Sequence, residues 1–294
     1  MLFRSPNFLQ AAERRGIPVA VINGRISERT FRGYNRARGL LPQLDLIRTY
    51  CVQDEAYRQR LLDLGVDSAR VFVTGNMKYD SVKMAQHAAI GGELRRWLLP
   101  PGGLVLVAGS THHDEEVRLC AAVAKACAVD GPRVRIVLVP RHPERAPAVC
   151  EALRGAGIEV VRWTENQGKA PLAPAAVVLV DTIGQLQKFY AAADVAFVGG
   201  SLIPHGGQNM LEPAAQGRAV VFGPHIANFR TDVEVLLRAE AAIQVADDDE
   251  LARRFRELFG SEQRRAELGQ RAERVITENQ GATMRTLRQI QSLF

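Results

Sequence analysis

The sequence predicts the α/β class, in which parallel strands alternate with helices. Short apolar runs, for example at 104–108, 134–139 and 195–198, end on glycine, proline or polar turn residues, and helical segments follow them. The chain has 294 residues, of which 47% are hydrophobic and 24% are charged, so it is long enough for two domains with substantial cores. Loops at the carboxyl ends of such strands form the ligand edge of a parallel sheet.

Composition narrows the possible functions. The formal net charge of +6 suits an anionic partner such as a phosphate or an acidic membrane surface, and no dense Lys/Arg block points to nucleic acid. No apolar run reaches the roughly 20 residues that span a bilayer. The four cysteines form no C-x-x-C pair, which favours a reducing cytoplasmic setting. The histidines show no zinc-ligand spacing, and G-x-S-x-G and G-x-G-x-x-G motifs are absent, which disfavours a metal, a serine hydrolase and NAD.

Residues 1–99 predict an amino-terminal domain. A helix capped at Ser5-Pro6 leads into a strand at 17–22, and the loop that follows carries Arg25, Ser27 and Arg29. This loop is either a binding surface or a solvated charged loop. A later strand at 71–74 leads to G-N-M-K-Y-D, in which Lys78 could place a cation against a leaving phosphate.

The linker P-P-G-G predicts a boundary near residue 100 and a second domain over 100–275, with the helix at 276–294 packing back on the first domain. Ser110 and Thr111 follow the strand at 104–108, where they could cap a helix or bind a phosphate. Arg141 follows the strand at 134–139, where its planar guanidinium suits a phosphate or carboxylate.

The stretch at 194–229 organises the second domain. A strand ends on Gly199-Gly200, Gly206-Gly207 follow, and the pattern predicts a helix from about Gln208. Glycines before a helix leave amides open to an anion, and Asn209 and Glu212 share one face of the first turn. These features suit a phosphate and a sugar diol, but an ordinary strand–turn–helix with tightly packed glycines would show the same spacing.

The residues themselves are more specific than their spacing. The run G-G-S-L-I-P-H-G-G-Q-N-M-L-E-P-A-A-Q-G, followed by F-G-P-H-I-A-N-F, closely resembles the 3-deoxy-D-manno-octulosonic acid (Kdo) transferases of lipopolysaccharide synthesis. The resemblance extends to N-G-R-I-S-E-R-T-F-R-G-Y, G-N-M-K-Y-D, G-S-T-H and D-T-I-G-Q-L, and it covers nearly the whole chain. Gln185 departs from the family, which has glutamate there, so nucleotide contacts could persist in weakened form.

This resemblance implies a GT-B fold, in which two Rossmann-like domains face a cleft. It implies a CMP-Kdo donor, a lipid A precursor (lipid IV-A) as acceptor, the anionic cytoplasmic face of the inner membrane as location, and neither metal nor other cofactor. Lys78 would stabilise charge on the leaving group. The residues implied for the nucleotide are Pro140, Arg141, Ile183, Gly184, Gln185, Asn209, Met210, Leu211 and Glu212. Phosphate or acceptor contacts are expected from Ser110, Thr111, Gly206, Gly207, Arg25, Ser27 and Arg29.

The front of the chain departs from the family pattern. Of the family motif E-T-E-L-W-P-N only Pro6-Asn7 remains, and the family's base glutamate and membrane-anchoring segment have no counterpart. We therefore expect an incomplete first domain and a chain that binds CMP without useful Kdo transfer. Two alternatives stay open: another GT-B transferase or epimerase, favoured if UDP binds in preference to CMP, and a nucleotide-binding remnant without catalysis.

Overall fold

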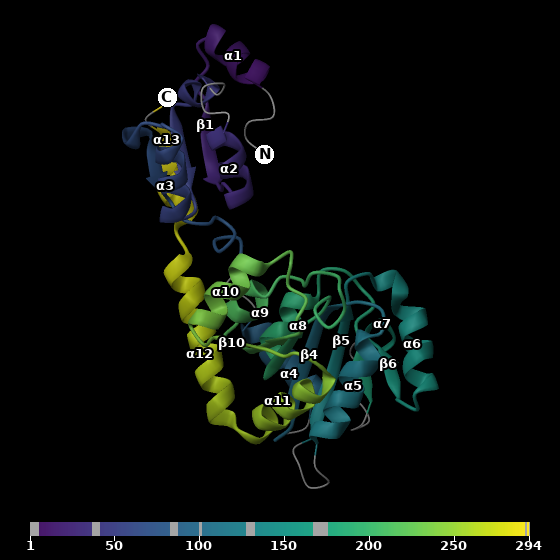
Figure 1. Cartoon of the computed structure of the whole chain (residues 1–294). Coiled ribbons are helices and arrows are strands. Elements are labelled where there is room, and N and C mark those ends of the chain that lie inside the picture. The colour runs from purple at the N-terminus through teal and green to yellow at the C-terminus, as the bar shows by residue number, and fades with distance from the viewer. Residues whose placement is uncertain are drawn as a thin grey trace. The chain divides into compact units, whose positions relative to one another are not determined.

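The computed structural model describes residues 6–36, 42–82, 88–99, 102–127, 133–166, 176–291 and 293 (Figure 1). It divides into two compact units, which are described separately. Unit 1 comprises Met1–Ser81 with Asn279–Phe294, and unit 2 comprises Val82–Glu278. The predicted helix cap at Ser5 and the linker prolines Pro100 and Pro101 lie outside the described residues.

Unit 1 is built on a three-stranded parallel sheet in the order β1-β2-β3. Its strands are β1 (Ala20–Gly24), β2 (Thr49–Val52) and β3 (Val71–Val73). Its helices are α1 (Pro6–Arg14), α2 (Glu28–Arg36), α3 (Glu55–Asp63) and α13 (Ala282–Gln291), with short 3₁₀ turns at Pro42–Leu46 and Ser68–Arg70. The apolar run that forms β2 is buried along its whole length, as the central strand of a covered parallel sheet requires.

Unit 2 contains a seven-stranded sheet in the order β10-β9-β8-β4-β5-β7-β6, and every pairing in it is parallel. The strands are β4 (Leu104–Thr111), β5 (Val134–Pro140), β6 (Val160–Arg162), β7 (Val177–Leu179), β8 (Val195–Val198), β9 (Ala219–Phe222) and β10 (Ala242–Gln244). The helices are α4 (Ala88–Leu98), α5 (Glu115–Ala126), α6 (Ala146–Gly155), α7 (Trp163–Asn166), α8 (Leu186–Ala192), α9 (Leu211–Ala215), α10 (Arg230–Arg238), α11 (Asp248–Gly260) and α12 (Glu262–Asn279).

Helices cover both faces of this sheet (Figure 1). Leu106 and Leu138 pack into a core that includes residues of α5, α6 and α11. Their neighbours Val107 and Val137 point the other way, into a core shared with α4 and α8. Successive strand residues therefore enter opposite cores, which explains why the strands read as continuous apolar runs. The α/β class predicted from the sequence is confirmed.

Unit 2 begins at Val82, before the P-P-G-G linker at which the sequence predicts the domain boundary. The sequence places the domain boundary after residue 99, whereas α4 belongs to unit 2 because it packs along α8. Arg95 of α4 donates to the Asp194 carboxylate at 2.6 Å and to the carbonyl of Ala192 at 3.1 Å. At the other end, α12 ends at Asn279 and the last helix, α13, begins at Ala282 rather than at residue 276 as the sequence predicts. Asn279–Phe294 groups with unit 1.

Among the helices of the described residues, none combines the length and apolarity that crossing a bilayer would need.

Candidate functional site

The strand order of unit 2 reverses between β4 and β8. On one side of β4 lies β5, the next strand along the chain, and on the other side lies β8, which is followed outward by β9 and β10. Loops that leave the carboxyl ends of β4 and β8 therefore diverge to opposite faces. In open α/β sheets ligands bind in the crevice at such a switch point. The loops predicted for the nucleotide after β4, β5, β7 and β8 all lie on this carboxyl edge.

A buried carboxylate holds the two switch-point loops together. Glu115, in the first turn of α5, is fully buried, and its two oxygens accept hydrogen bonds from four backbone amides. The donors are His112 N at 2.9 Å, Gly200 N at 2.7 Å, Ser201 N at 3.0 Å and Leu202 N at 3.0 Å. A carboxylate at a helix amino terminus is favoured by the helix dipole. Glu115 therefore fixes the glycine-rich loop after β8 to the loop after β4.

The next residue, Glu116, organises the loop after β4. It accepts a hydrogen bond from the Thr111 hydroxyl at 3.0 Å and forms an ion pair with Arg145 at 3.1 Å. Thr111 is fully buried, so its hydroxyl acts within the protein and the phosphate contact considered for it has no support here. Arg145 thus pairs with a buried acid rather than with one at the surface. Ser110 is half-buried and has a left-handed backbone with φ of 54°.

Most amides of the glycine-rich loop have protein acceptors, contrary to the prediction that glycines leave them open. Gly200 N donates to Glu115, and Gly207 N donates to the Gly200 carbonyl at 2.7 Å. A side chain at Gly199 would place its Cβ 2.5 Å from the carbonyl oxygen of Ser110, so this glycine allows β8 and β4 to approach closely. Hydrogen bonds within the loop and to Glu115 therefore hold this turn, and they leave few of its amides available to an anion.

Helix α9 begins at Leu211, three residues later than the pattern predicts. The side chain of Asn209 explains the shift, because its Oδ1 accepts from Leu211 N at 3.2 Å and so competes with the helix for that amide. Its Nδ2 donates to Glu212 Oε1 at 3.0 Å. Asn209 and Glu212 are therefore brought together as predicted. Met210 and Leu211 are fully buried, which leaves only their backbone for any ligand.

Glu212 lies near the end of β4. Its negative charge is a secondary cause, after burial, of the raised pKa of the Tyr190 hydroxyl in α8. That hydroxyl in turn occupies the space where a side chain at Gly109 would lie. The carboxylate of Glu212 is half-buried. Glu212 is thus placed close to the switch point, where it can present an oxygen to a sugar hydroxyl.

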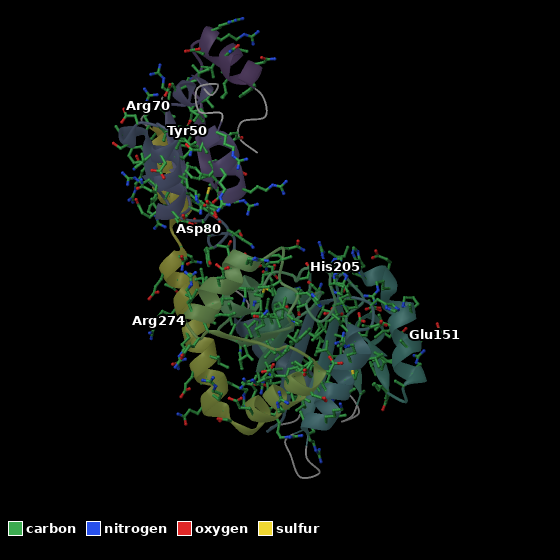
Figure 2. All side chains as sticks on the ribbon, in the orientation of Figure 1. Tyr50, Arg70, Asp80, Glu151, His205 and Arg274 are labelled. Atoms are coloured by element: carbon green, nitrogen blue, oxygen red, sulfur yellow. The ribbon has the colours of Figure 1, made fainter. Side chains whose placement is uncertain are left out.

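Three histidines gather at the same crevice. The ring of His112, after β4, lies 3.8 Å from that of His205 between ring centroids and 6.1 Å from that of His142, which follows β5. Gln208 Nε2 is 3.1 Å from His112 Nε2. His112 is almost buried, whereas His205 and His142 are exposed, and Figure 2 shows His205 at the rim of unit 2. Of these three histidines, only His112 belongs to a motif that the sequence shows, G-S-T-H.

The cluster is electropositive. The pKa of His112 is lowered to about 4, first by burial and then by the positive charges of neighbouring groups. Those groups are His205, Arg145, His142 and Arg141. His112 is therefore neutral at pH 7. Arg141 is exposed, and its backbone amide donates to the Thr111 carbonyl at 3.0 Å, which anchors it beside the β4 loop. An anion is the ligand that this edge favours.

The loop after β7 is open to solvent. Ile183 is 85% exposed, and Gly184 has a φ of 82°. Gln185 immediately precedes α8 but its side chain makes no capping hydrogen bond; instead its Oε1 accepts from Lys188 Nζ at 3.1 Å. Gln185 also lines a cavity of about 420 Å³ whose described walls come from α4, α7 and α8. Those walls are formed by Ile90, Glu93, Leu94, Trp97, Trp163, Gln185, Lys188 and Phe189, and among described residues they include neither Arg141 nor Glu212.

Unit 1 brings three loops together at the carboxyl edge of its own sheet. Asn23, with a φ of 51°, accepts through Oδ1 from Gln53 Nε2 at 3.0 Å and from Met77 N at 3.2 Å. Lys78 follows Met77 on this edge and is half-buried. Arg25, Ser27 and Arg29 are all exposed. The Ser27 hydroxyl accepts from Thr30 N at 3.2 Å, which identifies it as a cap of α2.

Asp80, the last residue of G-N-M-K-Y-D, holds the C-terminal helix (Figure 2). Its carboxylate accepts from Gly281 N at 2.6 Å and from Thr283 N at 2.5 Å, at the start of α13. Burial would raise the pKa of Asp80, but these hydrogen bonds and the charge of Arg285 hold that pKa below its ordinary value. The sequence shows the motif but gives no sign of this partner, because about 200 residues separate the two segments.

Comparison with known proteins identifies relatives for both units. A family model described as 3-deoxy-D-manno-octulosonic-acid transferase (kdotransferase) matches residues 5–81. The chain is 31% identical over 284 residues to the 3-deoxy-D-manno-octulosonic acid transferase of Haemophilus influenzae, covering 96% of this chain and 66% of that protein. It is 32% identical over 288 residues to the same enzyme of Bordetella pertussis, covering 96% and 65%.

Solved structures show the same relationship. The C-terminal CMP-Kdo binding domain of WaaA from Acinetobacter baumannii superposes with a TM-score of 0.59 at 28% identity, covering 65% of this chain and 97% of that domain. Anabaena HepE, solved in complex with UDP, gives a TM-score of 0.54 at 15% identity over 97% of this chain and 74% of its own length, a likeness of fold alone. The chain spans 66% of the length of the Haemophilus influenzae transferase and 65% of that of the Bordetella pertussis enzyme.

Proposed function

The chain belongs to the 3-deoxy-D-manno-octulosonic acid transferase family and has a GT-B type α/β fold, and we propose that its unit 2 binds the CMP-Kdo donor for the transfer of Kdo to a lipid A precursor. One observation carries this proposal. Unit 2, which is similar to a CMP-Kdo binding domain, presents a cationic carboxyl edge at the point where its strand order reverses. CMP-Kdo is an anionic sugar nucleotide, so this edge suits it.

In this proposal unit 2 binds the donor. The guanidinium of Arg141 supports the phosphate, and the Pro140 backbone shapes the adjoining wall. The exposed Ile183 and Gly184 and the half-buried Gln185 form a loop that contacts the nucleotide, with Gln185 contributing an uncharged acceptor. Gly206 and Gly207 shape the turn beneath the ligand, and the half-buried Ser110 lies close enough to the switch point to contact the phosphate.

The ribose is assigned to Glu212. Its carboxylate has two acceptor oxygens, one of which receives the Asn209 amide at 3.0 Å, and a carboxylate can accept from both hydroxyls of a diol. Asn209 thus fixes the orientation of Glu212 while the backbone of Met210 and Leu211 packs beneath it. Hydrogen bonds to a charged acceptor are each worth about 1.5–3 kcal/mol.

Unit 1 is assigned to the acceptor and to the leaving group. Lys78 would neutralise negative charge that develops on the departing CMP, which is electrostatic stabilisation of the transition state. The exposed Arg25 and Arg29, with Ser27 between them, offer charge and a hydroxyl to the phosphates of a lipid IV-A type acceptor. The net charge of +6 suits peripheral contact with the anionic cytoplasmic face of the inner membrane.

A transfer assay tests the proposal. CMP-Kdo is generated in the reaction and lipid IV-A is offered as the acceptor, with the 294-residue chain and with the Haemophilus influenzae relative as positive control. Formation of product by the unaltered chain, and its loss in Lys78→Ala, would support the role assigned to Lys78. CMP binding without any transfer by the chain would instead support a nucleotide-binding role alone. Transfer from a UDP-sugar but not from CMP-Kdo would overturn it.

A further inference from the structure

The histidine cluster of the switch-point crevice has an arrangement that packing alone does not require. His112 and His205 come from loops after β4 and β8 and stack with ring centroids 3.8 Å apart, and His142 approaches from the loop after β5 at 6.1 Å. Two stacked imidazoles cannot both carry a charge at this distance without a nearby anion, because like charges repel strongly where water is scarce. An anionic ligand bound beside the cluster would therefore favour protonation of one of its histidines.

We propose that the donor phosphate lies against His112, His205 and Arg141, and that its binding is coupled to the uptake of a proton by His112. This inference rests on the proposed function, since it names the part of the donor that these side chains recognise. The adjacent loop amides do not compete for the phosphate, because Glu115 holds those of Gly200, Ser201 and Leu202.

The surroundings of His112 explain why its ring is neutral. Its pKa lies at about 4 because the ring is buried and because cationic groups surround it. The charged and titratable groups that face it come from three elements: Glu115 and Glu116 on α5, Arg141, His142 and Arg145 after β5, and His205 after β8. Glu116 pairs with Arg145, so these two charges largely offset each other, and Glu115 directs its oxygens to backbone amides.

Gln208 gives the cluster two states. In the structure its Nε2 lies 3.1 Å from His112 Nε2, so the ring nitrogen accepts a hydrogen bond and carries no proton. A half-turn of the Gln208 amide would place its oxygen there instead, to accept from the protonated ring. A phosphate that neutralises the cationic neighbours removes their contribution to the lowered pKa and adds a negative charge that favours the protonated ring, while burial still acts in the opposite direction. If that pKa returns to its ordinary value of about 6.5, His112 gains about half a proton at pH 6.5.

The experiment is titration calorimetry of the full 294-residue chain at pH 6.5, in two buffers of different ionisation enthalpy. The probe is cytidine 5′-(methyl phosphate), a phosphodiester that does not titrate in this range and that lacks the Kdo carboxylate. The difference between buffers gives the number of protons taken up. We expect uptake of about half a proton by the unaltered chain. Cytidine, which lacks the phosphate, should bind without this uptake.

Two variants complete the test. His112→Gln should lose the uptake and bind the diester at least about tenfold more weakly, the loss of one hydrogen bond to a charged group. The matched control is His113→Gln, because the side chain of His113 is 83% exposed and pairs with Asp114. It should keep both affinity and uptake. If His112→Gln does not fold, the pKa of His112 is followed by NMR in the unaltered chain, with and without the diester, and a rise on binding is expected.

The outcomes separate this inference from the proposed function. Binding without proton uptake, or uptake that survives in His112→Gln, overturns the inference and leaves donor binding intact. Equal uptake with cytidine also overturns it, because the phosphate would then not be the cause. If neither the diester nor cytidine binds, the assignment of the donor to unit 2 is contradicted.

Discussion

Glu115 Oε2 lies 2.7 Å from the backbone nitrogen of Gly200, so a carboxylate buried at the start of α5 holds the loop that follows β8. The contact joins segments 85 residues apart in sequence. The Glu115 carboxylate occupies amides of the glycine-rich loop, so those amides bond within the protein. The loop is thereby held in one conformation, which makes the crevice of unit 2 preorganised.

Glu115→Gln should lower the free energy of unfolding of unit 2 by about 1–3 kcal/mol. The amide keeps one acceptor but turns an NH₂ group towards backbone N–H donors, so buried donors lose their partner. Urea denaturation followed by tryptophan fluorescence measures this, since both tryptophans, Trp97 and Trp163, lie in unit 2 and pack 5.1 Å apart.

The matched control is Asp249→Asn, which also removes a charge from the first turn of a helix. Asp249 is 76% exposed and pairs only with Lys125 in the described contacts, so its change should stay within about 0.5 kcal/mol. Equal effects of the two substitutions would mean that the Glu115 contacts do not stabilise the loop.

Asp80→Asn should release α13 from the sheet of unit 1. The substitution removes the charge that accepts Gly281 N and Thr283 N, and each such hydrogen bond is worth about 1.5–3 kcal/mol. Hydrogen exchange of the amides at 281–291, read by mass spectrometry, should become at least about tenfold faster. Asp63→Asn, on the exposed face of α3, is the control and should leave exchange of α13 unchanged.

The docking of α13 should also depend on pH. The pKa of Asp80 is lower in the folded state than its ordinary value of 3.8, so the unfolded state binds more protons in this range. The stabilisation is therefore complete above pH 3.8 and is lost as the pH falls through the folded pKa. Exchange at 281–291 should rise as the pH falls below that value, beyond the intrinsic rate, and Asp80→Asn should abolish the pH-dependent part. A pH-independent excess in both proteins would contradict this assignment.

Glu212→Ala should weaken CMP binding by about 1–3 kcal/mol, through loss of charged hydrogen bonds to the ribose diol. Titration calorimetry gives the affinity, and circular dichroism confirms that the variant is folded. Glu151→Ala is the control, because Glu151 is exposed on α6 (Figure 2). Unchanged affinity in a folded Glu212 variant would move the ribose contact to another residue.

The sequence predicts the strands and most helices because each buried strand is a short apolar run between turn residues. It also predicts that Arg141, Gly184, Asn209 and Glu212 share one sheet edge, since parallel strands end together. It does not predict that Glu115 occupies the loop amides or that His205 stacks on His112. These contacts join residues 85 or more positions apart, and no local pattern encodes them.

The shift of the unit boundary has a similar origin. P-P-G-G is a plausible linker by composition, but the contact of Arg95 with Asp194 draws α4 into unit 2. The late start of α9 follows from the Asn209 side chain, which bonds to the Leu211 amide. Helix periodicity alone predicts neither the position of the unit boundary nor the start of α9. A carboxylate at the start of a helix that follows a glycine-containing strand end would have been the available signal for Glu115.

The central claim is that unit 2 recognises the cytidine nucleotide of the donor. Titration calorimetry of one preparation with CMP and with UMP tests it most directly, because the two ligands share ribose and phosphate and differ in the base. We predict that CMP binds at least about tenfold more tightly, the equivalent of one hydrogen bond that uracil cannot reproduce. Equal or tighter binding of UMP, or no binding of CMP, would contradict the claim.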